Sequence, residues 1–136
     1  MQTTAEARAG VMAALERLNT LFWQRDAAIL SEFAADDVAL IGSEVSEVVA
    51  GREQVEQFLR RVLGQPAHHW WEWTTVHVSS RGSIAWLFAD GSIVIPGEGR
   101  QSRLPFRITG VLEEVDGKWL WRQFHAAEPV PDRSPG

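Results

Sequence analysis

The first half of the chain carries three stretches in which apolar residues follow a helical spacing. In residues 7–22 apolar side chains recur every three or four positions, which predicts an amphipathic helix from a capping box at Thr3 to about Gln24. Asp26 suits the N-cap of a short second helix, and the apolar stripe in residues 51–63 predicts a third.

The second half changes to a strand pattern. A short strand at 38–41, with a partner at 45–50, is predicted before the third helix. The long predicted strands cover residues 70–78, 84–95, 104–115 and 118–127. These segments are rich in β-branched and aromatic residues and are separated by short turns, so they predict an antiparallel meander.

Helices that precede a run of strands are typical of an α+β fold, with the helices packed on one face of a single sheet. A length of 136 residues suits one hydrophobic core. We therefore expect one domain over residues 1–128. The polar, Pro-rich segment 129–136 predicts a flexible C-terminal tail.

The composition limits the compartments and the classes of partner to be expected. The chain has no cysteine, which excludes disulfides and thiolate chemistry and suits a reducing compartment. A formal net charge of -5 argues against nucleic acid as a partner. No apolar run approaches the roughly 20 residues that cross a bilayer, and the N-terminus lacks the features of a signal peptide. We expect a cytoplasmic protein with neither a nucleic-acid nor a membrane partner.

Two motifs carry a resemblance to a known family. The first is FAADDV at residues 33–38, followed by a helix that opens at Gly51. The second is DGKW at residues 116–119, with His125 six residues after the Trp. In this order the chain resembles, over about residues 15–128, the SnoaL-like and ketosteroid isomerase-like branch of the nuclear transport factor 2-like superfamily. The resemblance implies a cone-shaped, curved antiparallel sheet wrapped around three helices.

The resemblance also indicates which positions hold catalytic or ligand-binding residues in other members of the superfamily. The base and phenol positions of the ketosteroid isomerases match about Gly42 and Leu18, and the Asp position of the cyclases and epoxide hydrolases matches Phe124. The pocket positions of the hub domain of calmodulin-dependent kinases match Leu30, Val55, Phe88, Gly110 and Ala126. Because all of these positions are apolar here, the resemblance points to a hydrophobic ligand or to none.

Three functions stay open on this basis. The first is a pocket protein that binds a small apolar molecule and needs no cofactor. The second is an isomerase, dehydratase or polyketide-cyclase-type enzyme with unassigned catalytic residues. The third is a non-catalytic, hub-like assembly domain. Two titratable groups that meet in a closed pocket would favour the enzyme, and a uniformly apolar pocket would favour the binder.

The register of the last hairpin decides which side chains face the pocket. A three-residue loop at 115–117 puts Leu120, Arg122 and Phe124 on the apolar inner face, whereas a two-residue turn puts Trp119 and Trp121 there. We favour the three-residue loop because it keeps the apolar face continuous. The expected ligand-binding residues are Leu18, Leu30, Val55, Phe58, Trp86, Phe88, Asp90, Phe106, Ile108, Arg122 and Phe124.

Few of the titratable residues are candidates for a catalytic or ligand-binding role. We expect Asp90 and Arg122 to pair on the inner face, because a buried guanidinium needs a partner. Glu44 or Glu47, in a loop near the pocket mouth, is a candidate general base. His69 and His77 lie too far apart along one strand to share a metal ion, so no metal site is expected. His125 is expected on the outer face.

Seven tryptophans and no tyrosine make an unusual set of aromatic residues. On alternating strands, the WWEW run at 70–73 and the pair Trp119 and Trp121 must place some indole rings outside the core. Such rings favour an interface, and members of the superfamily commonly dimerise through the outer sheet face. We therefore expect a homodimer that covers Trp119, Trp121, Arg107, Thr109 and Val111.

Overall fold

The computed structural model describes residues 3–66 and 68–133. The elements are α1 (Ala5–Gln24), the 3-10 helix η1 (Ala27–Glu32), β1 (Ala39–Ile41), β2 (Val48–Ala50), α2 (Arg52–Leu63), β3 (Trp70–Arg81), β4 (Ile84–Gly97), β5 (Arg100–Val115) and β6 (Lys118–Ala127). The α+β prediction is confirmed. Residues 128–133 form no helix or strand, and the last part of the expected tail, 134–136, lies outside the described residues.

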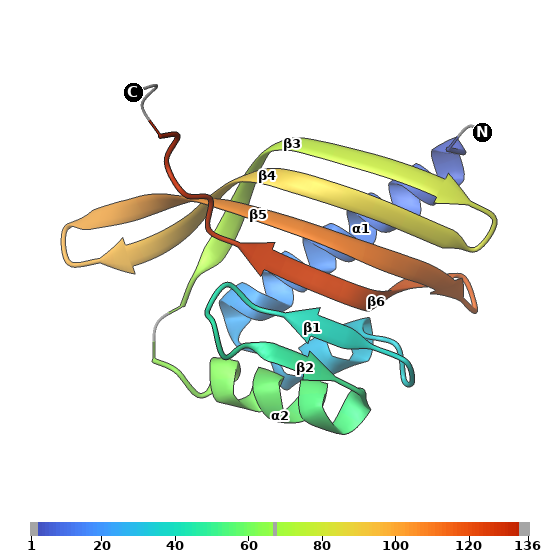
Figure 1. Ribbon diagram of the computed structural model, residues 1–136, viewed down its shortest axis with the longest axis horizontal. Coiled ribbons are helices and arrows are strands. Elements are labelled where there is room, and N and C mark those ends of the chain that lie inside the picture. Colours follow the sequence, from blue (N-terminus) through green and yellow to red (C-terminus); the bar gives the residue numbers. More distant parts are fainter. Residues whose placement is uncertain (1–2, 67, 134–136) are drawn as a thin grey trace.

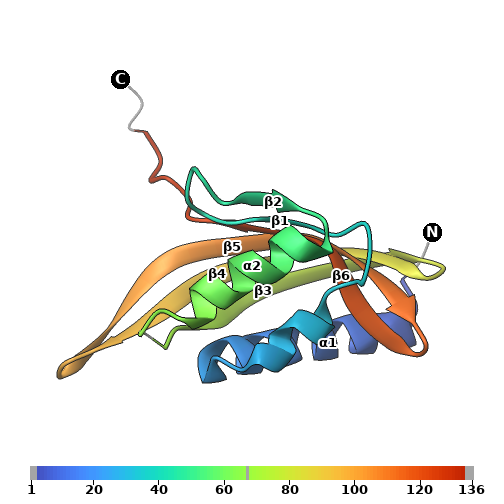
Figure 2. The same ribbon diagram turned by 90° about the horizontal axis from the view of Figure 1, so that it is seen from below.

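One curved sheet organises the molecule. Its strand order is β2-β1-β6-β5-β4-β3, and all neighbours are antiparallel except β1 and β6, which run parallel. Figure 1 shows α1 crossing behind the sheet, and Figure 2 shows α1 and α2 on the same side of it. The hydrophobic core therefore lies between the helices and one face of the sheet, called the inner face below.

The start of α1 differs by one residue from the prediction. Thr4 is the N-cap, because its hydroxyl oxygen accepts a hydrogen bond from the backbone N–H of Ala7 at 3.0 Å. The hydroxyl oxygen of Thr3 instead accepts from the N–H of Ser80 at 3.0 Å. Thr3 thus ties the beginning of the helix to β3.

The predicted loop of the last hairpin is wrong. Val115 pairs with Lys118, so Asp116 and Gly117 form a two-residue turn, and both have positive φ (51° and 82°), as a tight hairpin turn requires. This register turns Trp119 and Trp121 inward, where they are 4% and 0% exposed. The expectation that they cover an outer dimer face is therefore wrong as well.

A β-bulge restores the predicted faces further along β6. Trp121 pairs with Leu112 and Gln123 with Val111, so Arg122 is an extra residue without an opposite partner. The bulge shifts the alternation by one position. Phe124 is consequently buried on the inner face and His125 is exposed, both as predicted.

The predicted orientation of β4 is wrong. Ala85 pairs with Leu112 and Ala89 with Ile108, and residues that pair across neighbouring strands share a face. The small alanines are therefore buried. Trp86 and Phe88 point outward, and their side chains are 40% and 45% exposed. Large aromatic side chains usually face the core, which predicted Trp86 and Phe88 inward. The pairing of β4 with β5 instead determines which face of β4 points inward.

Candidate functional site

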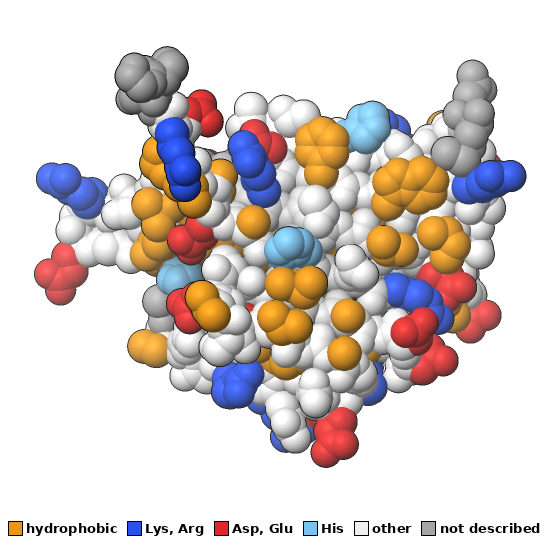
Figure 3. All heavy atoms as spheres, viewed as in Figure 1, with side chains coloured by type: hydrophobic (Ala, Val, Ile, Leu, Met, Phe, Trp, Pro, Cys, Tyr) orange, Lys and Arg blue, Asp and Glu red, His pale blue; other side chains and the backbone are white. Residues whose placement is uncertain are grey.

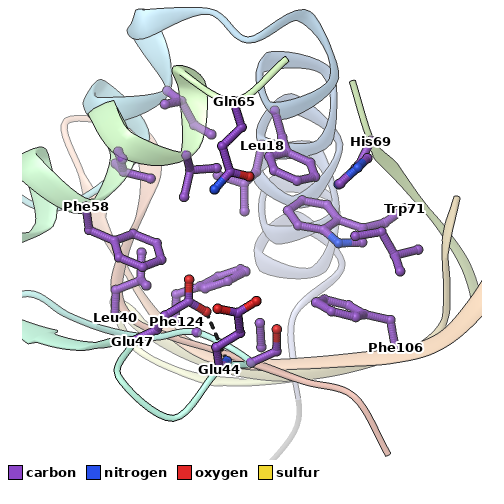
Figure 4. A pocket seen from close by; sticks show the side chains of 18 of the residues that line it. Leu18, Leu40, Glu44, Glu47, Phe58, Gln65, His69, Trp71, Phe106 and Phe124 are labelled. Atoms are coloured by element: carbon purple, nitrogen blue, oxygen red, sulfur yellow. Dashed lines mark hydrogen bonds between the residues drawn. The ribbon is translucent and has the colours of Figure 1, made fainter. Parts of the chain in front are cut away.

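A hollow of about 250 Å³ lies at one end of the inner face. It is bordered by the second half of α1, by α2, by the loop between β1 and β2, and by strands β3 to β6. Six aromatic side chains line it, together with aliphatic ones: Phe22, Phe33, Phe58, Trp71, Phe106 and Phe124. Figure 4 shows Phe58, Phe124, Phe106 and Trp71 around the open space.

Trp71 is the most firmly held of these rings. The side-chain amide of Asn19 donates to the carbonyl of Trp71 at 2.8 Å and accepts from its backbone N–H at 2.9 Å. Phe22 stacks on the indole at a centroid distance of 4.3 Å. Two side chains of α1 thus fix both the backbone and the ring of Trp71, which makes this wall preorganised.

The polar part of the wall comes mainly from the loop between β1 and β2. The backbone N–H of Gly42 donates to the carbonyl of Glu47 at 2.7 Å, and the N–H of Glu44 donates to Oε1 of Glu47 at 3.0 Å. A Cβ atom at Gly42 would lie 2.4 Å from that Oε1. Glycine is therefore required here for the Glu47 carboxylate to fold back over the loop, as Figure 4 shows.

His69 lines the other side of the hollow, across from the two glutamates (Figure 4). Burial lowers the pKa of His69 most, and the positive charge of Arg25 and the neighbouring His68 lower it further. The imidazole is therefore neutral at pH 7. In this form it offers one hydrogen-bond donor and one acceptor to the cavity.

Sequence comparison places the chain in a family. The SnoaL-like domain matches residues 11–131, which is most of the chain. The chain belongs to the SnoaL-like family. No protein with a curated description matches this SnoaL-like domain in sequence.

Solved structures support the same fold. An NTF2-like protein of unknown function from Pseudomonas putida KT2440 is similar at a TM-score of 0.82 and 19% identity, covering 96% of this chain and 92% of that one. A proposed dehydratase of the NTF2-like family from Streptomyces avermitilis is similar at a TM-score of 0.79 and 19% identity, covering 90% and 96%. A protein of unknown function with a cystatin-like fold from Nostoc punctiforme PCC 73102 reaches 0.73 at 17% identity, covering 93% and 94%. At these identities the likeness concerns the fold alone.

Several of the predicted site residues line the cavity of this SnoaL-like domain. Leu18, Phe58, Phe106 and Phe124 do so. Val55 and Ile108 are fully buried in the core beside it, and Leu30 is partly buried against that core, with Ile29 taking its expected place in the wall. The positions that the resemblance gives to acid–base groups, Leu18, Gly42 and Phe124, all border the hollow without a titratable side chain.

Other predicted site residues lie elsewhere. Trp86 and Phe88 are on the outer face, and so is Asp90, which accepts a hydrogen bond from Arg107 at 2.9 Å instead of pairing with Arg122. The expected ion pair between Asp90 and Arg122 is therefore wrong.

Arg122 is the bulge residue and does not line the hollow. It donates to Glu113 at 2.7 Å and to the side chain of Asp36 at 3.2 Å. The hydrogen bond to Glu113 is the main cause that raises the pKa of Arg122. This guanidinium joins the acidic turn after η1 to the sheet, which is a structural role.

The sequence reading missed Phe22, Trp71 and His69 as cavity residues. One signal was available, because His69 and Trp71 are two positions apart and therefore share a strand face. Which face that is follows only from the packing of α1 on β3.

Within residues 3–66 and 68–133 there is no group of three or more His, Asp or Glu side chains arranged to hold a metal ion. No helix in this part of the chain has the length and apolar character needed to cross a membrane. The absence of a cofactor stays a prediction.

Proposed function

We propose that this SnoaL-like domain binds a small, flat apolar molecule in the hollow between its helices and its sheet. The observation that carries the proposal is the wall of six aromatic side chains around about 250 Å³ of space. Apolar pockets with a few polar groups are the usual form of small-molecule sites, and those for drug-sized ligands measure roughly 300–1,000 Å³. A slightly smaller space suits a ligand of one or two rings.

The energetic argument concerns the unfilled space. Cavities in protein cores cost roughly 24 cal/mol per Å³, so a dry cavity of about 250 Å³ would cost up to ~6 kcal/mol. The polar mouth admits water, which reduces this cost but leaves the aromatic wall poorly packed. A ligand that covers the rings would regain these contacts.

A variant whose cavity is filled by a larger side chain tests the proposal. Ala126 lines the hollow, whereas the adjacent Ala127 lies on the alternate face of β6. Isothermal titration calorimetry with naphthalen-2-ylmethanol should show binding to the unmodified protein and to Ala127→Phe, but not to Ala126→Phe. Circular dichroism checks that both variants fold. Equal binding to both variants, or none to the unmodified protein, would refute the proposal.

An acid–base enzyme is the second candidate, as an isomerase, dehydratase or cyclase. The neutral His69 in the cavity wall supports it, together with the likeness to the proposed dehydratase. Against it, Glu47 and His69 lie on opposite sides of the hollow and do not converge (Figure 4).

A proton-exchange assay tests this second candidate. Incubation with 2-tetralone in D₂O should give faster deuterium exchange next to the carbonyl with the protein than with buffer, and His69→Gln should abolish the difference. Exchange at the buffer rate would count against the enzyme.

We also propose a homodimer through the outer sheet face. Its interface contains Trp86 and Phe88, because Trp119 and Trp121 are buried in the core. The ring of Phe88 stacks on His77 at 5.4 Å, and Figure 3 shows hydrophobic side chains spread over the sheet side of the molecule. Exposed aromatic groups of this kind favour an interface. Light scattering should show that the unmodified protein is a dimer and that the Trp86→Glu variant is a monomer. A larger assembly of the unmodified protein would favour the hub-like alternative. A monomeric unmodified protein would refute both proposals.

A further inference from the structure

The charged side chains around the cavity are all of one sign. Glu44, Glu47 and Glu128 line it, and no Lys or Arg among the described residues does. We call these three glutamates the carboxylate rim. Among the described residues, the only other titratable side chain in the wall is His69, whose pKa is lowered by burial. The polar part of the site therefore presents negative charge and hydrogen-bond acceptors.

The carboxylate rim has no cationic partner in the part of the chain that the structure describes. In residues 3–66 and 68–133 no Lys, Arg or His nitrogen lies within 4.0 Å of a rim carboxylate in a salt bridge, whereas Glu32, Glu72 and Glu113 each pair with an Arg. Glu47 is fixed in place by the N–H of Glu44. A carboxylate held at a cavity mouth without a cation is a ready partner for a cationic ligand group.

The positive groups near the cavity lie elsewhere. Arg25 donates to the backbone carbonyl of Gln65, and besides burial its charge lowers the pKa of His69. Figure 4 shows Gln65 and His69 across the hollow from Glu44 and Glu47. Arg61 lies over the ring of Phe58 at 5.7 Å and does not line the hollow. Since neither Arg lines the hollow, Glu44 and Glu47 are the charged groups that the cationic end of a ligand would meet at this side of it.

The apolar wall favours the same kind of ligand. Flat rings pack against Trp71, Phe106 and Phe124, and the faces of aromatic side chains attract cations. We propose that the cavity prefers an aromatic amine, with its ring in the hollow and its protonated amino group at Glu44 and Glu47. This inference rests on the proposed binding function, and it predicts weaker binding of anionic aromatic ligands because the rim repels them.

A matched ligand series separates this inference from the function on which it rests. The ligands are naphthalen-2-ylmethylamine, naphthalen-2-ylmethanol and 2-naphthoate, which share one ring system and carry a cation, a neutral group and an anion. Calorimetry should give the amine an affinity about tenfold higher than the alcohol, since charge-assisted hydrogen bonds contribute more than neutral ones. The naphthoate should bind more weakly than the alcohol.

Variants locate the source of the preference. Glu47→Gln should lower the affinity for the amine about tenfold, whereas Glu114→Gln, which removes an exposed carboxylate that does not line the cavity, should leave it unchanged. Raising the salt concentration should reduce the amine preference. If the alcohol and the amine bind equally, or Glu47→Gln keeps the preference, the inference fails while the apolar binding function stands. If none of the three ligands binds, the proposed function fails with it.

Discussion

The two ends of the inner sheet face use aromatic residues in opposite ways. At one end Trp119 and Trp121 are buried and closely packed, because a Cβ atom at Gly10 of α1 or at Gly110 of β5 would lie 2.4 Å from their indole rings. At the other end Phe106 and Phe124 border a hollow beside the second half of α1. We call these the packed end and the open end. Both ends use the apolar strands β5 and β6, so the difference comes from what packs against these strands: Gly10 lets α1 lie close to Trp119, whereas a hollow remains beside Phe106 and Phe124.

The largest expected effect is on stability at the packed end. Trp121 is fully buried, so Trp121→Ala should lower the free energy of unfolding by about 4 kcal/mol, the usual cost of removing a large core ring. At the open end, Phe58→Ala should cost only about 2 kcal/mol, because the deleted ring already borders empty space. Urea unfolding of both variants measures this, and equal losses would break the comparison.

A buried charge should also matter more at the packed end. Glu32 is 2% exposed and pairs with Arg17 at 2.9 Å and with Lys118 at 3.0 Å. Glu32→Gln should cost roughly 2 kcal/mol, below the value for fully buried pairs because the two cations are partly hydrated. The control is Glu56→Gln, whose exposed pair with Arg60 is expected to contribute less than about 0.5 kcal/mol. Similar losses in both variants would show that Glu32 does not hold the packed end together.

At the open end, a small change in the loop should alter binding more than stability. Gly42→Ala places a methyl group against the Glu47 carboxylate and should displace it. The affinity for naphthalen-2-ylmethylamine should then fall about fivefold, with little change in melting temperature. An unaltered affinity would mean that the orientation of Glu47 has no part in binding.

The smallest expected effect is a pH dependence from His69. Its pKa is lowered in the folded protein, while the unfolded chain keeps a value near 6.5. As the pH falls below that value the unfolded state takes up the proton first, so the folded state loses stability on acidification until the lowered pKa is reached. Between pH 7.5 and 5.5 the melting temperature of His69→Gln should therefore fall less than that of the unmodified protein. A larger fall in the variant would contradict the assignment.

Much of the fold was predictable because it depends on patterns that repeat along the chain. The apolar stripes of α1 and α2 and the four long strands were visible in the spacing of their side chains. The family resemblance supplied the curvature of the sheet. These features draw on many residues at once, so single errors did not alter them.

The cavity was harder to predict because single residues decide it. The turn at Asp116 and Gly117 sets one register, and the bulge at Arg122 sets another a few positions later. A strict alternation along β6 was therefore wrong for Trp119 and Trp121 and right for Phe124. For β4, alternation gave two faces, but only its pairing with β5 showed that Ala85 and Ala89 face inward while Trp86 and Phe88 do not.

The indole N–H resonances test the contrast between the two ends most directly. Trp71 borders the open end, and Trp119 is buried in the packed end beside Gly10. After assignment by single Trp→Phe variants, a titration with naphthalen-2-ylmethanol should shift the ¹⁵N–¹H indole signal of Trp71 and leave that of Trp119 in place. A shift of Trp119 as large as that of Trp71, or no shift of Trp71 at saturating ligand, would contradict a ligand cavity at the open end.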